Sequence, residues 1–258
     1  MTAVIITGLL LIIFGAAYVF LALPRITDSA DMELQSSDYA RGGLWGNGIP
    51  ENSFPAIIKA ITCGYGIELD VTLSRNQKPI VISKDRASLL AEILELVDGR
   101  VSVMIHLEAS GRIGVLCRAV TRVLDGYDGA FAIVSSNTDV LVWFRKYRPR
   151  FARGFILFPY KALRKNSKAK HPLLSSFVRA NMLTNFICRP DFISADGARR
   201  KSLPLLLFNK MLGIPCFVRN VGTPAAYKEA RSKGMFAVFE KTLPKNQINN
   251  IKRKRGTS

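Results

Sequence analysis

The chain has 258 residues, enough for one large domain or two small ones, and 48% of them are hydrophobic, which supports a buried core. A formal net charge of +18 favours phosphate-bearing partners such as anionic lipid, nucleic acid or phosphorylated metabolites, and disfavours cationic ones. The four cysteines have no close pairing and no Cys-x-x-Cys motif, which indicates free thiols in a reducing compartment and not a disulfide framework.

The first element is an apolar stretch over residues 2–23 that contains no charged side chain. About 20 helical residues cross the ~30 Å hydrocarbon core of a bilayer. The stretch is too long for the core of an ordinary signal peptide, and it lacks the basic residues and the cleavage site of one. We therefore expect one N-terminal transmembrane helix as an anchor over residues 1–24, with a buried core helix as the alternative. This predicts a single-pass membrane protein. The basic remainder favours a cytoplasmic domain over a periplasmic one.

A polar linker over residues 25–37 follows, and beyond it strand-like and helix-like segments alternate. Most of the strand candidates are continuous apolar runs, which is typical of strands buried on both faces. The expected strands cover residues 38–41, 66–73, 79–83, 101–107, 131–135, 154–158, 192–195, 214–218 and 235–239.

The expected helices lie between these strands, at residues 53–63, 88–97, 112–124, 139–147, 173–188, 203–212 and 224–233. Asn52-Ser53 and Thr223-Pro224 supply N-cap candidates, and Gly64, Gly213 and Gly234 stand where a left-handed residue ends a helix. About eight strand–helix units predict an α/β fold, a (β/α)8 TIM-type barrel, with an open doubly wound sheet as the alternative. No Gly-x-Gly-x-x-Gly turn follows the first strand, which argues against a dinucleotide site.

Two segments are strongly basic. Residues 160–171 and residues 245–258 each carry five Lys or Arg and no acidic side chain. They are either a solvated loop and a solvated tail, or contacts to an anionic membrane surface. We expect no nucleic-acid partner, because aromatic side chains are not interleaved with the basic ones and no reading motif is present.

Two carboxylates fall within one apolar strand. Glu68 and Asp70 are two residues apart, so they point to the same side of the strand. Burying both costs several kcal/mol unless something compensates their charge. A divalent cation such as Ca²⁺ or Mg²⁺ would do so, and so would a salt bridge, for which Arg41 and Lys84 are candidates.

The segment from residue 39 to 85 resembles the opening of the glycerophosphodiester phosphodiesterase family. Members have a strand ending in His-Arg-Gly, a Pro-Glu-Asn-Ser/Thr motif, a Gly-x-x-x-Glu-x-Asp-Val strand and a strand ending in His-Asp. This chain reads YARGGLWGNG, PENSFPAIIKA, GYGIELDVTLS and PIVISKD in the same order. Later segments, among them RPDFISADGARRKSLP, resemble bacterial members, so that the resemblance covers residues 38–244 and leaves 245–258 as a basic tail.

The resemblance implies an activity and a site. Family members hydrolyse glycerophosphodiesters to glycerol 3-phosphate and an alcohol, with two histidines as general acid and base and a divalent metal on the phosphate. Glu68 and Asp70 match the family's metal ligands, and His106 aligns with the third metal carboxylate. Glu51 of the PENS motif is a supporting residue of the same site.

The two family histidines are absent: Arg41 aligns with the first and Lys84 with the second. Neither replacement carries protons readily at neutral pH, because a Lys ammonium has a pKa of about 10.4 and an Arg guanidinium does not titrate. This predicts a catalytically impaired member, a pseudoenzyme. Arg41, Lys84 and Arg219 are then candidates for binding phosphate. Arg41 and Lys84 are also candidates for neutralising the acids without a metal.

Three functions remain open. The first is a membrane-anchored member of the family that binds a phosphodiester or a phospholipid head group without ordinary turnover. The second is an active metal-dependent phosphoric diester hydrolase that releases glycerol 3-phosphate with altered acid–base residues, Lys84 or His106. The third is a basic protein that binds a membrane surface by charge alone.

Overall fold

The computed structural model describes residues 1–22, 25, 34, 37–84, 86–108, 112–159, 172–199 and 202–241. The two basic segments, most of the linker and Asp85 lie outside the described residues.

The apolar N-terminal stretch forms the helix α1 (Thr2–Ala22). Phe20, near its end, lies under the guanidinium of Arg189, which follows α8 (Asn185–Cys188). Among the residues that the structure describes, no helix combines the length and the apolar character that crossing a bilayer requires. The predicted transmembrane anchor is therefore not supported.

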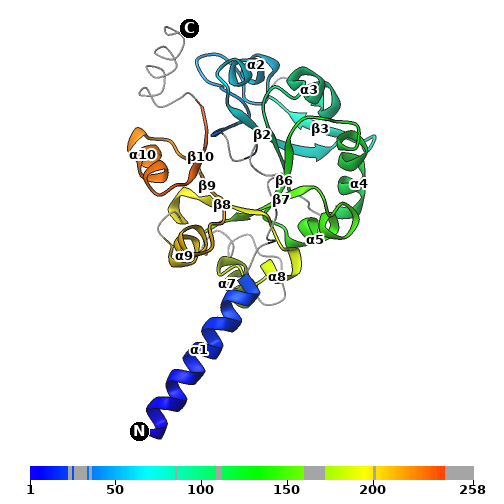
Figure 1. The fold of residues 1–258 in the computed structure, drawn as a ribbon. Coiled ribbons are helices and arrows are strands. Elements are labelled where there is room, and N and C mark those ends of the chain that lie inside the picture. The colour runs from blue at the N-terminus through cyan, green and yellow to red at the C-terminus, as the bar shows by residue number, and fades with distance from the viewer. Residues whose placement is uncertain are drawn as a thin grey trace.

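Eight parallel strands form a closed barrel, and helices surround it (Figure 1). β1 pairs with β10 on one side and with β2 on the other, which closes the sheet and excludes the open doubly wound alternative. The barrel strands, in the order of the sheet, are β1 (Tyr39–Arg41), β10 (Phe236–Phe239), β9 (Cys216–Arg219), β8 (Phe192–Asp196), β7 (Ala152–Leu157), β6 (Phe131–Ser135), β5 (Val103–Leu107) and β2 (Gly66–Leu73).

One predicted strand lies outside the barrel. β3 (Pro79–Ile82) pairs antiparallel with the last residues of β2 and with β4 (Ala87–Leu89), so the three strands form an extension at one side of the sheet. β4 replaces the first turn of the helix expected from residue 88, and α3 (Leu90–Val97) begins only after it.

The helices follow the predicted alternation. Ser53 and Thr223 are N-caps, as expected, and Gly64, Gly213 and Gly234 have the left-handed backbone that ends a helix. The single helix expected over residues 173–188 is two helices, because Met182 between them has a φ of 59°. The helices around the barrel are α2 (Phe54–Thr62), α3, α4 (Ile113–Leu124), α5 (Thr138–Tyr147), α7 (Pro172–Ala180), α8, α9 (Leu203–Leu212) and α10 (Pro224–Ser232).

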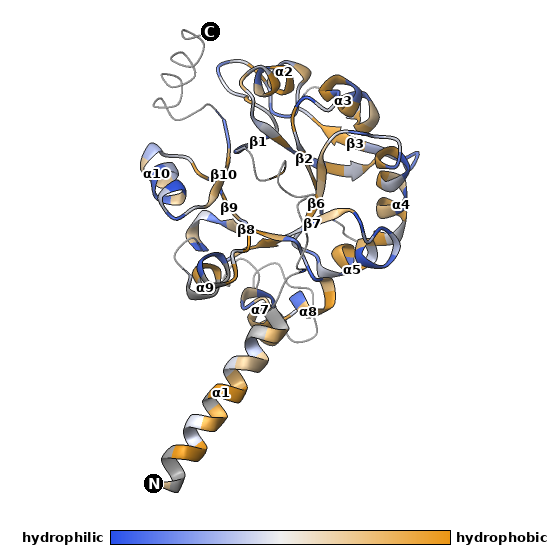
Figure 2. Ribbon diagram, in the orientation of Figure 1, coloured by the Kyte–Doolittle hydropathy of each residue, from blue (hydrophilic) through white to orange (hydrophobic). Residues whose placement is uncertain are grey.

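Apolar side chains fill two layers. The larger core lies between the barrel strands and their helices, and Figure 2 shows hydrophobic residues along both. The smaller cluster lies inside the barrel, where Tyr39 and Phe192 both pack edge-on against Phe217. Because side chains alternate along a strand, residues two positions after this inner cluster also point inward, one layer closer to the C-terminal ends of the strands. The candidate site occupies that layer.

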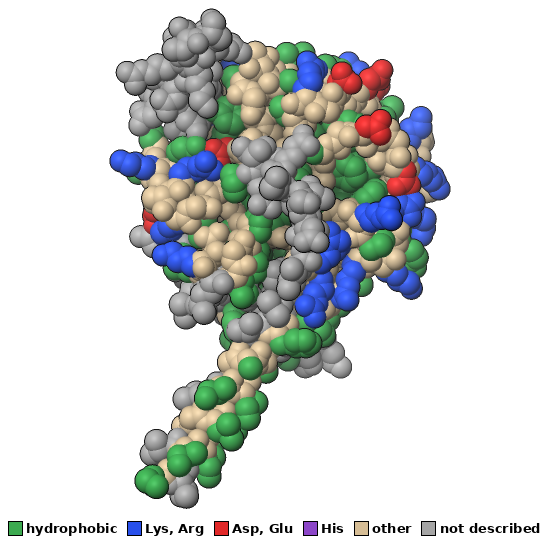
Figure 3. Space-filling model, in the orientation of Figure 1, with side chains coloured by type: hydrophobic (Ala, Val, Ile, Leu, Met, Phe, Trp, Pro, Cys, Tyr) green, Lys and Arg blue, Asp and Glu red, His purple; other side chains and the backbone are tan. Residues whose placement is uncertain are grey.

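Charge is unevenly distributed over the surface. In the view of Figure 3, Lys and Arg side chains gather over α4 and α5, and acidic side chains gather over α3. The basic residues of α4 and α5 include Arg118, Arg122, Arg145 and Lys146.

Candidate active site at the barrel mouth

The inward layer at the C-terminal ends of the strands is charged, whereas the layer below it is apolar. Arg41 comes two residues after Tyr39, His106 two after Met104, and Arg219 two after Phe217. Glu240 follows β10 at the same spacing from Val238. The strand pairing sets Arg41 beside Glu68 and Asp70 beside His106. The barrel thus gathers at one mouth the groups that the sequence places on separate strands.

Glu68 forms a closed ion pair with Arg219. The two guanidinium nitrogens donate to the two carboxylate oxygens over 2.5 and 2.6 Å. Both side chains are buried: Glu68 is 0% exposed and Arg219 only 3%. A bidentate pair of this kind satisfies both charges, which is the condition for burying them.

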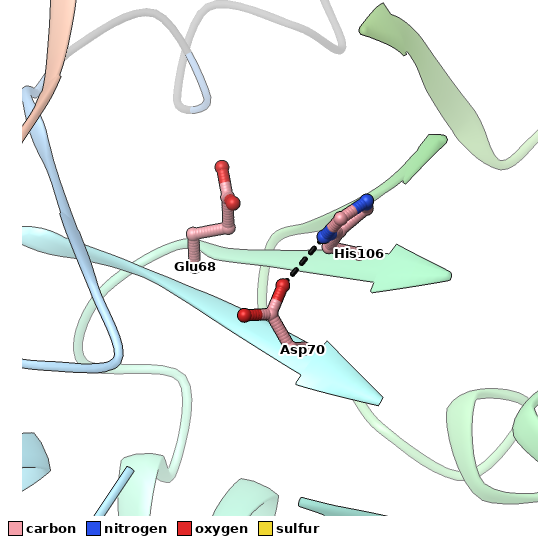
Figure 4. Close-up of side chains that lie close together, drawn as sticks. All are labelled: Glu68, Asp70 and His106. Carbon is pink, nitrogen blue, oxygen red and sulfur yellow. Dashed lines mark hydrogen bonds and ion pairs between the residues drawn. The ribbon is translucent and has the colours of Figure 1, made fainter. Parts of the chain in front are cut away.

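Asp70 lies between two basic groups. Its Oδ1 is 2.5 Å from Nδ1 of His106, and its Oδ2 accepts from Arg41 over 2.8 Å. Figure 4 shows the contact with His106 and Glu68 close beside it. Burial opposes the charge of Asp70, but the hydrogen bond with His106 and the nearby Arg41 outweigh it and lower the pKa of Asp70 to about 2. Nε2 of His106 is buried and has no hydrogen-bond partner.

Arg41 contacts three carboxylates. Besides Asp70 it donates to Glu240 over 2.7 Å, and its Nε lies 3.7 Å from Glu68. Burial works against its charge, yet the surrounding carboxylates raise the pKa of Arg41 above its ordinary value. Its side chain is 29% exposed, so Arg41 is the partly accessible guanidinium of the cluster and Arg219 the enclosed one.

The PENS loop places Glu51 above β1. The backbone N–H of Asn52 donates to the carbonyl of Gly42, and the Ser83 hydroxyl donates to the carbonyl of Glu51, so the loop is tied to the ends of β1 and β3. Burial raises the pKa of Glu51; Arg41 lowers it, whereas Asp70 and Glu240 raise it further. A Cβ on Gly42, whose φ is +66°, would lie 2.4 Å from Cγ of Glu51. Any side chain at Gly42 therefore requires the Glu51 side chain to move.

A cavity of about 530 Å³ opens at this mouth. The indole ring of Trp45 and the side-chain amide of Asn52 lie in its wall together with apolar residues. Lys241 lies over the Trp45 ring. The charged groups in its lining are Arg41, Glu51, Asp70, His106, Glu108 and Glu240.

Lys84 is not part of this cluster. It stands two residues beyond β3, its side chain is exposed, and it does not line the cavity, although Ile82 of β3 does. The second basic partner of the acids is Arg219 instead. The predicted pairing of Arg41 with Lys84 against Glu68, Asp70 and Glu51 is thus replaced by the pair Arg41 and Arg219.

The three predicted metal donors do come together. The ligand atoms of Glu68, Asp70 and His106 lie within 4.8 Å of one another. All four carboxylate oxygens, however, already contact basic groups: Arg219 at Glu68, and His106 and Arg41 at Asp70. A divalent cation at this point would lie next to two guanidinium groups, so the donors are present but the charges around them do not fit the metal.

The sequence interpretation missed two of these contacts. Arg219 was expected to bind phosphate, and Glu240 was not singled out. The alternation of side chains along each strand could have predicted both contacts. FVR at the end of β9 and VFE at the end of β10 each place a charged residue two positions after an inward apolar side chain.

Comparison with solved structures places this fold among known enzymes. No model of a known protein family matches the sequence, and no curated protein is significantly similar to it. A glycerophosphodiester phosphodiesterase from Parabacteroides distasonis is similar in structure, with a TM-score of 0.63 and 14% identity over 85% of this chain and 98% of its own. The corresponding enzyme of Thermotoga maritima has a TM-score of 0.59 and 17% identity over 79% of this chain and 94% of its own.

A third similar structure contains a ligand. It is a phosphodiesterase of Oleispira antarctica in complex with its product sn-glycerol-3-phosphate, with a TM-score of 0.61 and 16% identity over 79% of this chain and 92% of its own. The chain therefore has the TIM-barrel fold of the glycerophosphodiester phosphodiesterases, and the resemblance seen in the sequence is confirmed at the level of the fold.

Proposed function

We propose that this protein is a glycerophosphodiester phosphodiesterase-like protein that binds a phosphodiester or its glycerophosphate head group at the barrel mouth, with ordinary hydrolysis impaired. The observation that carries the proposal is the cavity of about 530 Å³ in which Arg41, Asp70 and His106 meet. Its position at the C-terminal ends of the strands is where barrels of this kind bind their ligands.

The lining suggests how such a ligand is held. Arg41 is the accessible guanidinium of the cavity, and Lys241 adds an ammonium beside Trp45. These two groups suit a phosphate, whereas the carboxylates of Glu240 and Asp70 suit the hydroxyls of a glycerol moiety. Arg219, committed to Glu68 and buried, has no part in phosphate binding, and neither does the exposed Lys84.

Impairment follows from the residues at the two histidine positions. Arg41 is held charged by three carboxylates, and Lys84 lies outside the cavity lining, so neither takes up the proton transfer of a general acid or base. The test is a pair of measurements on the full chain: calorimetric binding of sn-glycerol-3-phosphate and glycerophosphocholine, and release of glycerol 3-phosphate from the latter. We expect binding without turnover above the uncatalysed rate. No binding at millimolar ligand would contradict the proposal.

An active hydrolase with altered acid–base residues is the second candidate, and His106 is the observation that favours it. Its Nδ1 is fixed by Asp70 and its Nε2 is unpartnered in a side chain that lines the cavity. An imidazole oriented by a carboxylate is an arrangement that serves acid–base chemistry. If the wild-type chain turns over glycerophosphocholine and His106→Gln abolishes turnover but not binding, this second candidate replaces the first.

A further inference from the structure

The acidic centre of the barrel mouth has internal counterions of its own. Three carboxylates, Glu68, Asp70 and Glu240, contact three basic side chains over distances of 2.5–3.7 Å. The basic side chains are Arg41, His106 and Arg219. The acids and the bases come from five strands or strand ends, so the cluster is a product of the closed barrel.

Arg219 binds both carboxylate oxygens of Glu68. Both oxygens accept a guanidinium hydrogen bond, and neither side chain is more than 4% exposed. A cation could reach Glu68 only by displacing Arg219, whose charge would then be buried without a partner. Such displacement is unfavourable, because an unpaired buried charge is among the costliest defects in a protein.

Arg41 binds one oxygen of the second acid, Asp70. Its Nη2 binds Asp70 and its Nη1 binds Glu240, and the remaining oxygen of Asp70 contacts His106. The two guanidinium groups also approach the same carboxylate, since Arg41 Nε lies 3.7 Å from Glu68. Positive charge thus reaches each acid that the resemblance assigns to a metal.

We propose that Arg41 and Arg219 take the place of the divalent cation at this barrel mouth, so that the acidic cluster is assembled without metal. The proposal concerns the acids and their counterions and does not depend on which ligand the cavity binds. It makes Arg219 a structural replacement for a metal ion and Arg41 a replacement that is also accessible to the cavity.

The test is whether removing a guanidinium creates the metal site that it replaces. Full-length wild-type protein, freed of metal by a chelator, is unfolded thermally with and without about 10 mM CaCl₂, MgCl₂ or MnCl₂, a concentration that covers weak hard-cation sites. We expect the wild-type midpoint to move by less than about 1 °C, since a ligand that does not bind the native state does not stabilise it. Arg219→Met is expected to lower the midpoint by about 10 °C, as the loss of a buried ion-pair partner does in a chain of this size. Ca²⁺ is expected to restore at least half of that loss.

The matched control removes the acid as well. Arg219→Met/Glu68→Gln leaves no unpaired charge, and we expect it to be more stable than Arg219→Met and to gain nothing from Ca²⁺. If Arg219→Met does not fold, Arg41→Met provides the test. Arg41 is partly exposed, so its loss is better tolerated, and its removal frees Asp70 and Glu240. We expect Arg41→Met to bind Ca²⁺ in calorimetry and the wild type not to.

Two results would overturn the proposal. One is wild-type binding of any of the three cations that Asp70→Asn abolishes, which would show that metal and guanidinium groups coexist. The other is the absence of any metal response in the folded arginine variants, which would show that the arginines do not stand in for a cation.

Discussion

His106 on β5 and Asp70 on β2 face each other across adjacent strands, with Nδ1 of the imidazole 2.5 Å from Oδ1 of the carboxylate. Arg41 holds the other oxygen of Asp70, so this carboxylate, unlike an isolated buried one, is stabilised in its charged form. We therefore expect Asp70 to contribute to the dependence of stability on pH.

Stability should fall at acid pH through Asp70. Its folded pKa of about 2 is below its ordinary value of 3.8, so its contribution is complete above that value and is lost as pH falls toward 2. The difference corresponds to about 2.5 kcal/mol. Because the side chain is 35% exposed, screening reduces the expected effect to about 1–2 kcal/mol. Asp70→Asn should cost this much at pH 7 and little at pH 2 in chemical denaturation.

The control for this measurement is Asp128→Asn, an exposed aspartate between α4 and β6 at the opposite end of the barrel. It should change stability by less than about 0.5 kcal/mol at both pH values. An Asp70→Asn cost that persists unchanged at pH 2 would assign the effect to packing instead of charge.

Glu51 should change stability with pH in the direction opposite to that of Asp70. Its pKa is raised by burial and, despite Arg41, by Asp70 and Glu240, so the folded protein loses stability as pH rises above the ordinary range of a glutamate. Glu51→Gln removes the charge and should stabilise the protein by about 0.5–1 kcal/mol at pH 7, with the gain vanishing near pH 4. Glu108→Gln, at an exposed glutamate of the same cavity, is the matched control and should have no effect.

Gly42 should not accept a side chain. Its φ of +66° is unfavourable for other residues, and a Cβ would overlap Glu51. Gly42→Ala should cost about 2–3 kcal/mol in unfolding free energy. Gly48 has a φ of +88° but open space around its Cβ position, so Gly48→Ala should cost only about 1 kcal/mol. Equal costs would show that Glu51 moves aside.

Arg41 and Lys84, which align with the two family histidines, should differ in their effect on binding. Arg41→Ala is expected to weaken binding of sn-glycerol-3-phosphate at least about tenfold, as loss of one charge-assisted contact does. Lys84→Ala should change it less than about twofold, because this side chain is exposed and outside the cavity lining. Calorimetric titration of both variants provides the measurement, and a strong effect of Lys84→Ala would show that Lys84 takes part in ligand binding.

The alternation of apolar runs with helical segments was sufficient to predict the barrel, because strands buried on both faces leave a clear signal. β2 (Gly66–Leu73), β6 (Phe131–Ser135) and α9 (Leu203–Leu212) have the predicted bounds. The strand at 79–83 was predicted but its direction was not, since an apolar run does not say whether it joins the barrel or folds back on β2. The break between α7 and α8 was hidden because a positive φ at Met182 has no sequence signal of the kind that glycine gives.

The candidate site was predictable in its acids but not in its counterions. Glu68 and Asp70 could be paired from their spacing on one strand, and His106 from its alignment. Which basic side chain pairs with which acid depends on how strands far apart in sequence meet around the barrel. Arg219 and Glu68 are 151 residues apart, and only the closed sheet brings them within hydrogen-bond distance. The cytoplasmic placement and the contact with an anionic membrane surface stay predictions.

Closure of the sheet between β1 and β10 has a consequence for how the chain folds during synthesis. Glu68 and Asp70 are synthesised long before Arg219 and Glu240, and until the last two strands arrive the early acids lack the guanidinium that encloses Glu68. A nascent or truncated chain that ends before residue 216 would lack the guanidinium that pairs with Glu68 in the finished protein. The final strands thus complete both the barrel and the ion pairs at its mouth, and proteolytic loss of residues 216–258 would disrupt both together.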